Sequence, residues 1–169
     1  DNNQHHDFRR LKNGNTLYIG WEQMPKDAQA RMLGAENGSE DQDGITWSDY
    51  LREVDADGST VWEWHACSDM EIEDFPLHMM STRKEFLHCN TCVELPNGNI
   101  MLSFRKNSMI VVVEKKTKRI IKKWQNNDWG QQHDCQLLET SASRLVTTLL
   151  WRRGLYRLNA LDPGLELVK

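Results

Sequence analysis

The sequence is poor in cysteine and proline and contains no long apolar run. Its 169 residues include four Cys and four Pro, and so few cysteines do not build a small disulfide scaffold. The longest obvious apolar run covers residues 109–113, far short of the ~18 residues that a membrane-spanning helix needs. We therefore expect no membrane span, and the cysteines leave the redox compartment open.

A concentration of basic residues is also missing. The formal net charge is −4, and the one dense basic stretch covers residues 115–123. Proteins that bind nucleic acid usually present a basic surface, so we expect no nucleic-acid partner. The basic stretch is interpreted as a solvated outer hairpin rather than an anion-binding patch. With 38% hydrophobic residues and seven Trp, the chain is expected to form a packed core.

Two phrases recur along the chain and predict hairpins. The first is LKNGN at residues 11–15 and LPNGN at residues 95–99. Asn-Gly between apolar stretches is a strong hairpin signal, because both residues tolerate the positive φ of tight primed turns. The second phrase is a strand, a polar turn and a strand ending in Trp, at residues 51–64 and 109–124, with a less regular copy at 158–168. Two hairpins per unit predict a four-stranded antiparallel meander.

The spacing of these units predicts an all-β fold, namely a β-propeller with four-stranded antiparallel blades. Residues 95 and 138 are separated by about one blade period of ~40–45 residues. We expect one partial propeller domain over residues 1–169, with blades at about 5–65, 88–124 and 131–169 and insertions at about 24–46 and 66–87. Beyond residue 138 the turn phrase is lost, which weakens the third blade. Asp-x-Asp-Gly at residues 41–44 and 55–58 is expected to form turns rather than calcium loops.

Three blades do not close a ring, and an open stack leaves strand edges exposed. We therefore expect either a piece of a longer protein or a homo-oligomer that completes the circle.

Aligned on these turns, three histidines take equivalent places in the first strand of each unit: His6, His88 and His133. Side chains two positions apart share a strand face, and the first strand of a propeller blade lines the central channel. We expect the three rings to face one space. Each histidine alone could be a structural residue, but recurrence in register favours a functional set. Asp7 and Asp134 are expected on the opposite face and receive no catalytic role.

A metal site is the competing interpretation of the same region. Cys89 and Cys92 have Cys-x-x-Cys spacing, but a second ligand pair is not evident and strand alternation places the two on opposite faces. We assign no metal. Cys92 and Cys135 share register on adjoining units, which leaves a disulfide or a pair of packed thiols open.

Three stretches carry a family resemblance: residues 5–11 (HHDFRRL), 88–91 (HCNT) and 130–134 (GQQHD). They resemble the inner-strand signatures of the bacterial arylsulfotransferase propeller family, over about residues 5–138. The resemblance implies a six-bladed propeller, no cofactor, and a periplasmic or secreted location. It also implies transfer of a sulfuryl group from an aryl sulfate ester to a phenol through a sulfated histidine, without a nucleotide sulfate donor.

The resemblance assigns roles residue by residue. His133 matches the nucleophile, and His88 and Asn90 match the His-x-Asn pair that flanks the sulfate. Arg105 resembles the sulfate-binding arginine, and His6 is the remaining channel histidine. His5, the first residue of the His-His-Asp phrase, is expected to contact substrate.

The chemistry of these residue types supports the same assignment. Sulfuryl transfer, like phosphoryl transfer, spreads negative charge over equatorial oxygens, which cationic donors stabilise. Neutral imidazole is a nucleophile near pH 7, a second histidine can move the phenol proton, and arginine offers a fixed fork of donors. The alternatives are a strand-end salt bridge for Arg105 and, for the whole chain, a non-catalytic propeller that binds a protein or small ligand.

Overall fold

The computed structural model describes residues 3–125, 129–138, 144–148, 155–159 and 165–168. Strands dominate these residues, and the helical segments are short: α1 (Lys26–Arg31), α2 (Ala66–Asp69) and the 3-10 turn η1 (Ile72–Asp74). The prediction of an all-β fold is therefore confirmed. Within the described ranges no helix has the length and apolar character that crossing a membrane requires. The chain divides into two compact units, residues 1–89 and 90–169.

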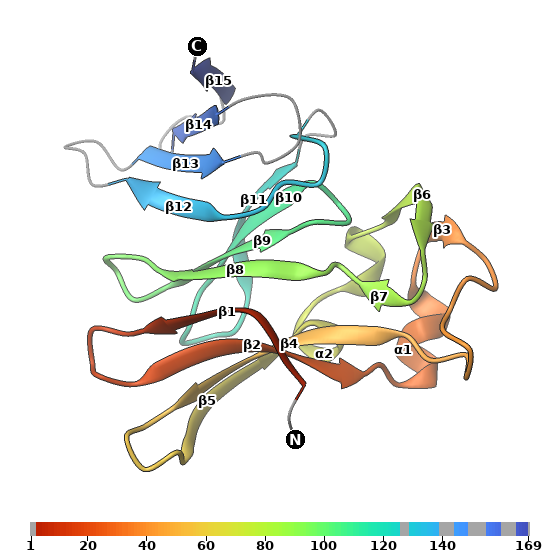
Figure 1. The fold of residues 1–169 in the computed structure, drawn as a ribbon, viewed down its shortest axis with the longest axis horizontal. Helices are drawn as coiled ribbons and strands as arrows, with labels where there is room; N and C mark the ends of the chain where they lie inside the picture. Colours follow the sequence, from red (N-terminus) through yellow and green to blue (C-terminus); the bar gives the residue numbers. More distant parts are fainter. Residues whose placement is uncertain (1–2, 126–128, 139–143, 149–154, 160–164, 169) are drawn as a thin grey trace. The chain divides into compact units, whose positions relative to one another are not determined.

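The first unit is built on one sheet of antiparallel neighbours (Figure 1). Its order is β1-β2-β4-β5, and β7 adds to β4 in parallel. The strands are β1 (Gln4–Arg10), β2 (Thr16–Gln23), β4 (Trp47–Val54), β5 (Thr60–His65) and β7 (Glu85–Phe86).

Alternation of side chains gives this sheet two different faces. The core face carries four almost fully buried apolar side chains: Leu17, Ile19, Leu51 and Trp64. Register places Trp21 and Asp49 further along the same face, opposite each other on β2 and β4. The other face carries Glu22 and His65 and is polar. One sheet thus presents two separate sets of titratable groups.

The second unit contains two four-stranded sheets. The first has the order β8-β9-β10-β11, and the second runs in chain order from β12 to β15. Their strands are β8 (Cys89–Glu94), β9 (Ile100–Phe104), β10 (Met109–Val113), β11 (Ile120–Gln125), β12 (Cys135–Leu138), β13 (Arg144–Thr148), β14 (Leu155–Asn159) and β15 (Leu165–Val168). β9 and β10 are buried at every position, as expected of inner strands covered on both faces. A core cluster here consists of Met101, Ile110, Val112, Trp129 and Cys135.

The recurring turn phrases form the hairpin loops that join β1 to β2 and β8 to β9. The amide of Leu11 donates to the carbonyl of Asn15 at 2.9 Å, and Gly14 donates back to Leu11 at 3.0 Å. The side-chain oxygen of Asn13 accepts the Asn15 amide at 3.0 Å, and residues 95–99 repeat all three bonds. Only the glycine of each Asn-Gly pair has positive φ, at 87° and 81°. The prediction of tight primed turns is therefore wrong, because Asn acts as a side-chain acceptor instead of adopting the left-handed conformation.

The two Asp-x-Asp-Gly stretches form turns, as predicted. Asp41 donates its amide to Ile45 at 3.1 Å, and Asp55 donates to Ser59 at 3.0 Å. In each turn the aspartate Oδ1 accepts two backbone amides of its own loop. These carboxylates therefore organise the turn itself.

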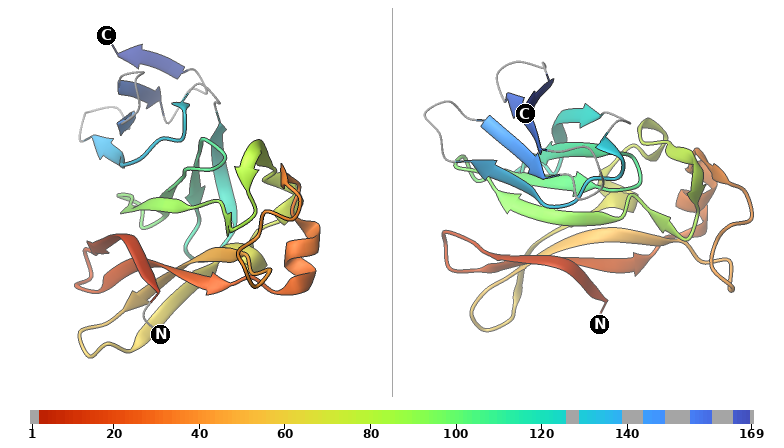
Figure 2. Two further views of the ribbon diagram at one scale, coloured as in Figure 1. Left: turned by 45° about the vertical axis from the view of Figure 1, so that its right-hand side comes forward. Right: turned by 45° about the horizontal axis from the view of Figure 1, so that its top comes forward.

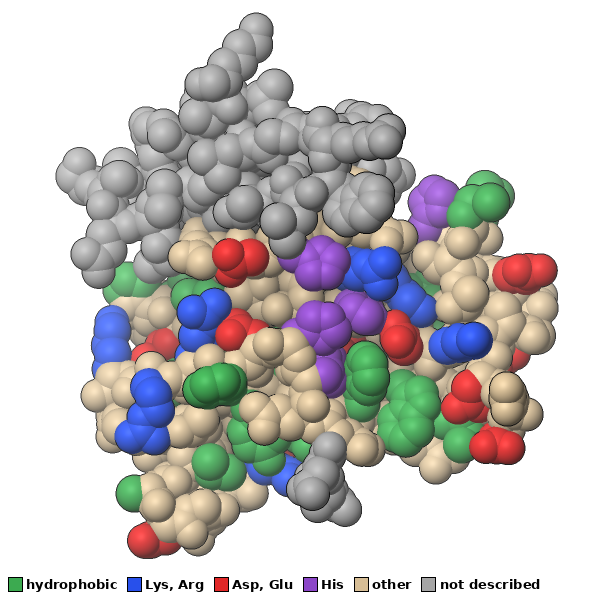
Figure 3. Space-filling view, viewed as in Figure 1, with side chains coloured by type: hydrophobic (Ala, Val, Ile, Leu, Met, Phe, Trp, Pro, Cys, Tyr) green, Lys and Arg blue, Asp and Glu red, His purple; other side chains and the backbone are tan. Residues whose placement is uncertain are grey.

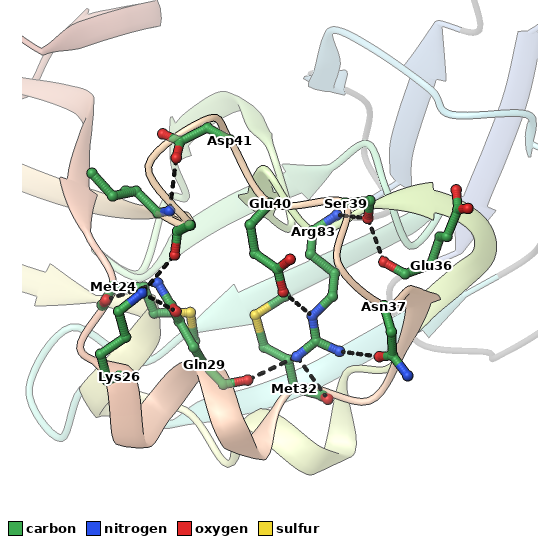
Figure 4. A network of polar contacts seen from close by, with 12 residues as sticks. Met24, Lys26, Gln29, Met32, Glu36, Asn37, Ser39, Glu40, Asp41 and Arg83 are labelled. Carbon is green, nitrogen blue, oxygen red and sulfur yellow. Dashed lines mark hydrogen bonds and ion pairs between the residues drawn. The ribbon is translucent and has the colours of Figure 1, made fainter.

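Residues between the sheet strands of the first unit form an appendage at one end of the sheet. β3 (Gly34–Glu36) pairs in parallel with β6 (Leu77–Thr82), and both views of Figure 2 show these strands together with α1. Arg83 ties the appendage together (Figure 4). Its guanidinium contacts the carbonyls of Gln29 (2.8 Å) and Met32 (3.4 Å) and the side chains of Asn37 (3.3 Å) and Glu40 (3.1 Å).

Candidate active site

The first unit carries His5 and His6 on a bulged part of β1. The register between β1 and β2 shifts between Gln4 and Phe8, and His6 has φ of 55°. A bulge breaks the two-residue alternation of a strand. Exposure still alternates along β1, with Gln4, His6 and Phe8 exposed and His5 and Asp7 half-buried, yet neighbouring His5 and His6 contact each other at the bulge.

His88 meets this pair from a distant part of the chain. Its Nε2 lies 3.1 Å from Nε2 of His6, and its Nδ1 lies 2.5 Å from Glu85. His5 and His6 approach through their Nδ1 atoms at 2.7 Å. Of the sequence-predicted residues, the first unit thus brings together His5, His6 and His88, which we call the histidine cluster.

The backbone at His88 is unusual. Leu87 and His88 have φ of 71° and 57°, and the residue precedes β8 rather than lying within it. Left-handed backbone is unfavourable for bulky residues and persists where the surroundings enforce it, commonly at functional sites. The ring of His88 is consequently placed by this kink and not by the face of a strand.

The histidine cluster rests on Trp21 and opens to solvent. The ring of His5 packs on Trp21 with centroids 4.2 Å apart. His88 is buried, whereas His6 is exposed. Histidine surface is visible in purple on the face drawn in Figure 3. The cluster therefore combines a buried anchor with an imidazole that a solute can reach.

In the second unit, His133 lies just before β12. Its neighbours Gln131 and Asp134 have φ of 64° and 54°. The ring Nδ1 lies 3.1 Å from the carbonyl oxygen of Gln131. A carbonyl oxygen can only accept a hydrogen bond, so Nδ1 carries the proton and Nε2 carries the lone pair. This is the tautomer in which Nε2 can act as a nucleophile.

Gln132 holds the segment that carries His133. Its buried side-chain amide donates to Ser103 Oγ (3.2 Å), to the Phe104 carbonyl (3.1 Å) and to the Met109 carbonyl (2.9 Å). Its own carbonyl accepts the side-chain amide of Asn90 at 2.8 Å. Asn90 is thus bonded to the residue directly before His133.

Arg105 lies in the turn directly after β9. His133, Asn90 and Arg105 belong to the second unit, and His6 and His88 to the first. A single site that contains all of them stays a prediction.

Sequence reasoning missed Asp49, Glu85, Trp21 and Gln132. Gln132 stands inside the GQQHD phrase and Glu85 lies three residues before His88, so local sequence held a signal for both. Trp21 and Asp49 are brought to the histidine cluster only by the pairing of β2 with β4. The four cysteines, including Cys92 and Cys135, are free thiols, so the disulfide alternative is wrong.

A second titratable cluster lies on the opposite face of the first sheet. Nδ1 of His65 lies 2.9 Å from Glu22, and this hydrogen bond raises the pKa of His65 against the smaller opposing effect of burial. Cys67 donates its thiol to Glu22 at 3.2 Å. Burial, followed by this bond, raises the pKa of Cys67 to about 12. Cys67 is therefore a neutral thiol at pH 7 and a poor nucleophile.

Comparison with known proteins adds a family and a fold. A family model described as Arylsulfotransferase (ASST) matches residues 1–145. No curated protein matches the sequence. A solved structure of a protein of unknown function from Bacteroides caccae matches 98% of this chain with a TM-score of 0.56 and 10% identity. This chain covers 46% of that protein's length. A streptogramin B lyase structure matches 88% of this chain with a TM-score of 0.46 and 11% identity, and the match covers 44% of the lyase chain.

Proposed function

The chain belongs to the arylsulfotransferase family, and on this premise we propose that it moves a sulfuryl group from an aryl sulfate ester to a phenol through a sulfated His133. The observation that carries the proposal is the hydrogen bond from His133 Nδ1 to the Gln131 carbonyl. It leaves the lone pair on Nε2, as a nucleophile requires. His133 also lies within the matched residues.

The proposed first step makes one bond and breaks one. Nε2 of His133 attacks the sulfur of the aryl sulfate while the bond from sulfur to the aryl oxygen breaks. The leaving aryl oxide takes a proton from an imidazole of the histidine cluster, for which His6 or His88 is proposed. Arg105, with Asn90 and His5, is proposed to hold the sulfate oxygens on which negative charge is shared.

The second step reverses the first with a new acceptor. The phenol oxygen attacks the sulfur on His133 and gives its proton to the histidine cluster, and the bond from sulfur to Nε2 breaks. The products are a new aryl sulfate and the original enzyme. The proposed reaction uses no cofactor, because donor, acceptor and imidazole supply every atom that moves.

Turnover of a nitrophenyl sulfate in the presence of phenol tests this function, with release of nitrophenol as the readout. We expect His133→Ala to lower kcat more than ~1,000-fold, because the covalent route is lost. Arg105→Lys should lower it about 100-fold, since a point charge does not replace a forked donor.

His78→Ala is the matched control, because His78 is an exposed histidine on β6, and its activity should equal that of the wild type. Wild-type turnover that survives His133→Ala contradicts the covalent route. Absence of turnover with several aryl sulfates favours a propeller that only binds its ligand.

A further inference from the structure

Asp49 is a buried carboxylate beside the histidine cluster. It lies on β4, and its side chain is 1% exposed. Buried carboxylates are normally paired with a cation or held by hydrogen bonds. Within the described ranges, the basic side chain that lies within ion-pair distance of Asp49 is His5.

One oxygen of this carboxylate contacts two distant segments. Oδ1 accepts the backbone amide of Cys89 at 2.9 Å and lies 3.3 Å from Nε2 of His5. Cys89 directly follows the left-handed residues Leu87 and His88. The same atom therefore adjoins the ring of His5 and fixes the backbone that presents His88.

The polar atoms of this contact are not fully satisfied. Oδ2 of Asp49 is buried without a hydrogen-bond partner, and Nε2 of His5 makes the 3.3 Å ion-pair contact with Oδ1 but no hydrogen bond. Most buried polar atoms in proteins are hydrogen-bonded, and exceptions accompany strain or catalysis. The surrounding structure therefore holds His5 and Asp49 together although their hydrogen bonding is incomplete.

We propose that Asp49 is a positioning residue for the proposed sulfotransfer, acting on the reaction through His5 and through the backbone after His88. This inference rests on the function proposed above. A carboxylate attracts a ring N–H and repels a ring lone pair, so the Asp49 oxygen 3.3 Å away favours the His5 tautomer protonated on Nε2. Nδ1 of His5 then presents its lone pair to His6, so Asp49 sets the order of protons between His5 and His6, while Nδ1 of His88 faces the Glu85 carboxylate.

Asp49→Asn separates this role from a merely structural one. The amide oxygen of Asn can still accept the Cys89 amide, while the charge beside His5 is lost. We expect kcat for nitrophenyl sulfate to fall at least ~10-fold, the order of loss seen when the partner that orients a metal-bound histidine is removed. KM should change much less, and the pH profile of kcat should change shape.

The matched control is Asp55→Asn. Asp55 also accepts backbone amides through Oδ1, in the turn between β4 and β5, and its replacement removes the same charge. Its kcat and pH profile should equal those of the wild type. An Asp49→Asn protein with wild-type kcat and pH profile overturns the proposal.

Nitrogen NMR of the imidazoles in the wild-type protein tests the proposal without activity and without a variant. His5 should carry a proton on Nε2, and a neutral His5 protonated on Nδ1 alone overturns the positioning role. If the wild type transfers no sulfate, the proposed function fails while the NMR result still decides the role of Asp49.

Discussion

At the residue scale, two titratable clusters occupy opposite faces of one sheet. The histidine cluster lies on the side of Trp21 and Asp49, and the cluster of Glu22, His65 and Cys67 lies on the other. The Cys67 thiol of the second cluster is not a nucleophile at pH 7, because its pKa is about 12. We therefore expect it to contribute to stability and not to sulfuryl transfer.

The His65–Glu22 pair makes stability depend on pH. The pKa of His65 is raised by its bond to Glu22, so its contribution is fully present below the unfolded value of ~6.5 and is lost as pH rises through the folded value. Both side chains are more than a quarter exposed, so the effect should stay below about 1 kcal/mol.

Urea unfolding between about pH 5.5 and pH 8.5 measures this dependence. Glu22→Gln should reduce it, and Glu71→Gln, at a largely exposed carboxylate, should retain it. An unchanged pH dependence in Glu22→Gln contradicts the pairing.

The sequence predicted that His6 and His88 lie together, but it did not predict how their rings are presented. Recurrence in register identified His6, His88 and His133, of which the first two do meet. Strand alternation does not predict the contact between His5 and His6 at a bulge, or the place of His88 in a left-handed segment before β8. Asp49 carried no local signal, since strand pairing alone brings it to His5.

At the element scale, the hairpin loops explain why Asn-Gly recurs. Gly98 has φ of 81°, and a Cβ placed there would meet no atom within 4 Å. Gly98→Ala should therefore cost only the left-handed strain, about 1–2 kcal/mol. Urea unfolding measures the loss, with Lys116→Ala in an exposed turn as the control. A Gly98→Ala protein as stable as the wild type would contradict the assigned turn geometry.

The position of these loops could be predicted from sequence, but their type could not. The Asn-Gly pair is compatible with an Asn that adopts positive φ and equally with an Asn whose side chain accepts a backbone amide.

The appendage could not be predicted from the sequence for a different reason. It depends on contacts of Arg83 with residues 29–40. Strands β4 and β5 separate these two segments in the sequence, so no local pattern links them.

At the scale of the whole molecule, the residues to which the proposal gives roles are divided between the two units. His6 and His88 belong to residues 1–89, and His133 and Arg105 belong to residues 90–169. The chain also spans less than half the length of its Bacteroides caccae structural relative. Four-stranded sheets could be predicted from the repeat, because each repeat is local in sequence, whereas the contact between His6 and His88 joins segments distant in sequence.

The central claim is that His133 carries the sulfuryl group, and trapping that intermediate tests it most directly. The protein is mixed with nitrophenyl sulfate without a phenol acceptor, quenched rapidly, digested and analysed by mass spectrometry. We expect one nitrophenol released per active site and one added sulfuryl group on the peptide that contains His133, with neither in His133→Asn. A burst of nitrophenol with the sulfuryl group on another residue, or turnover retained by His133→Asn, would contradict the account.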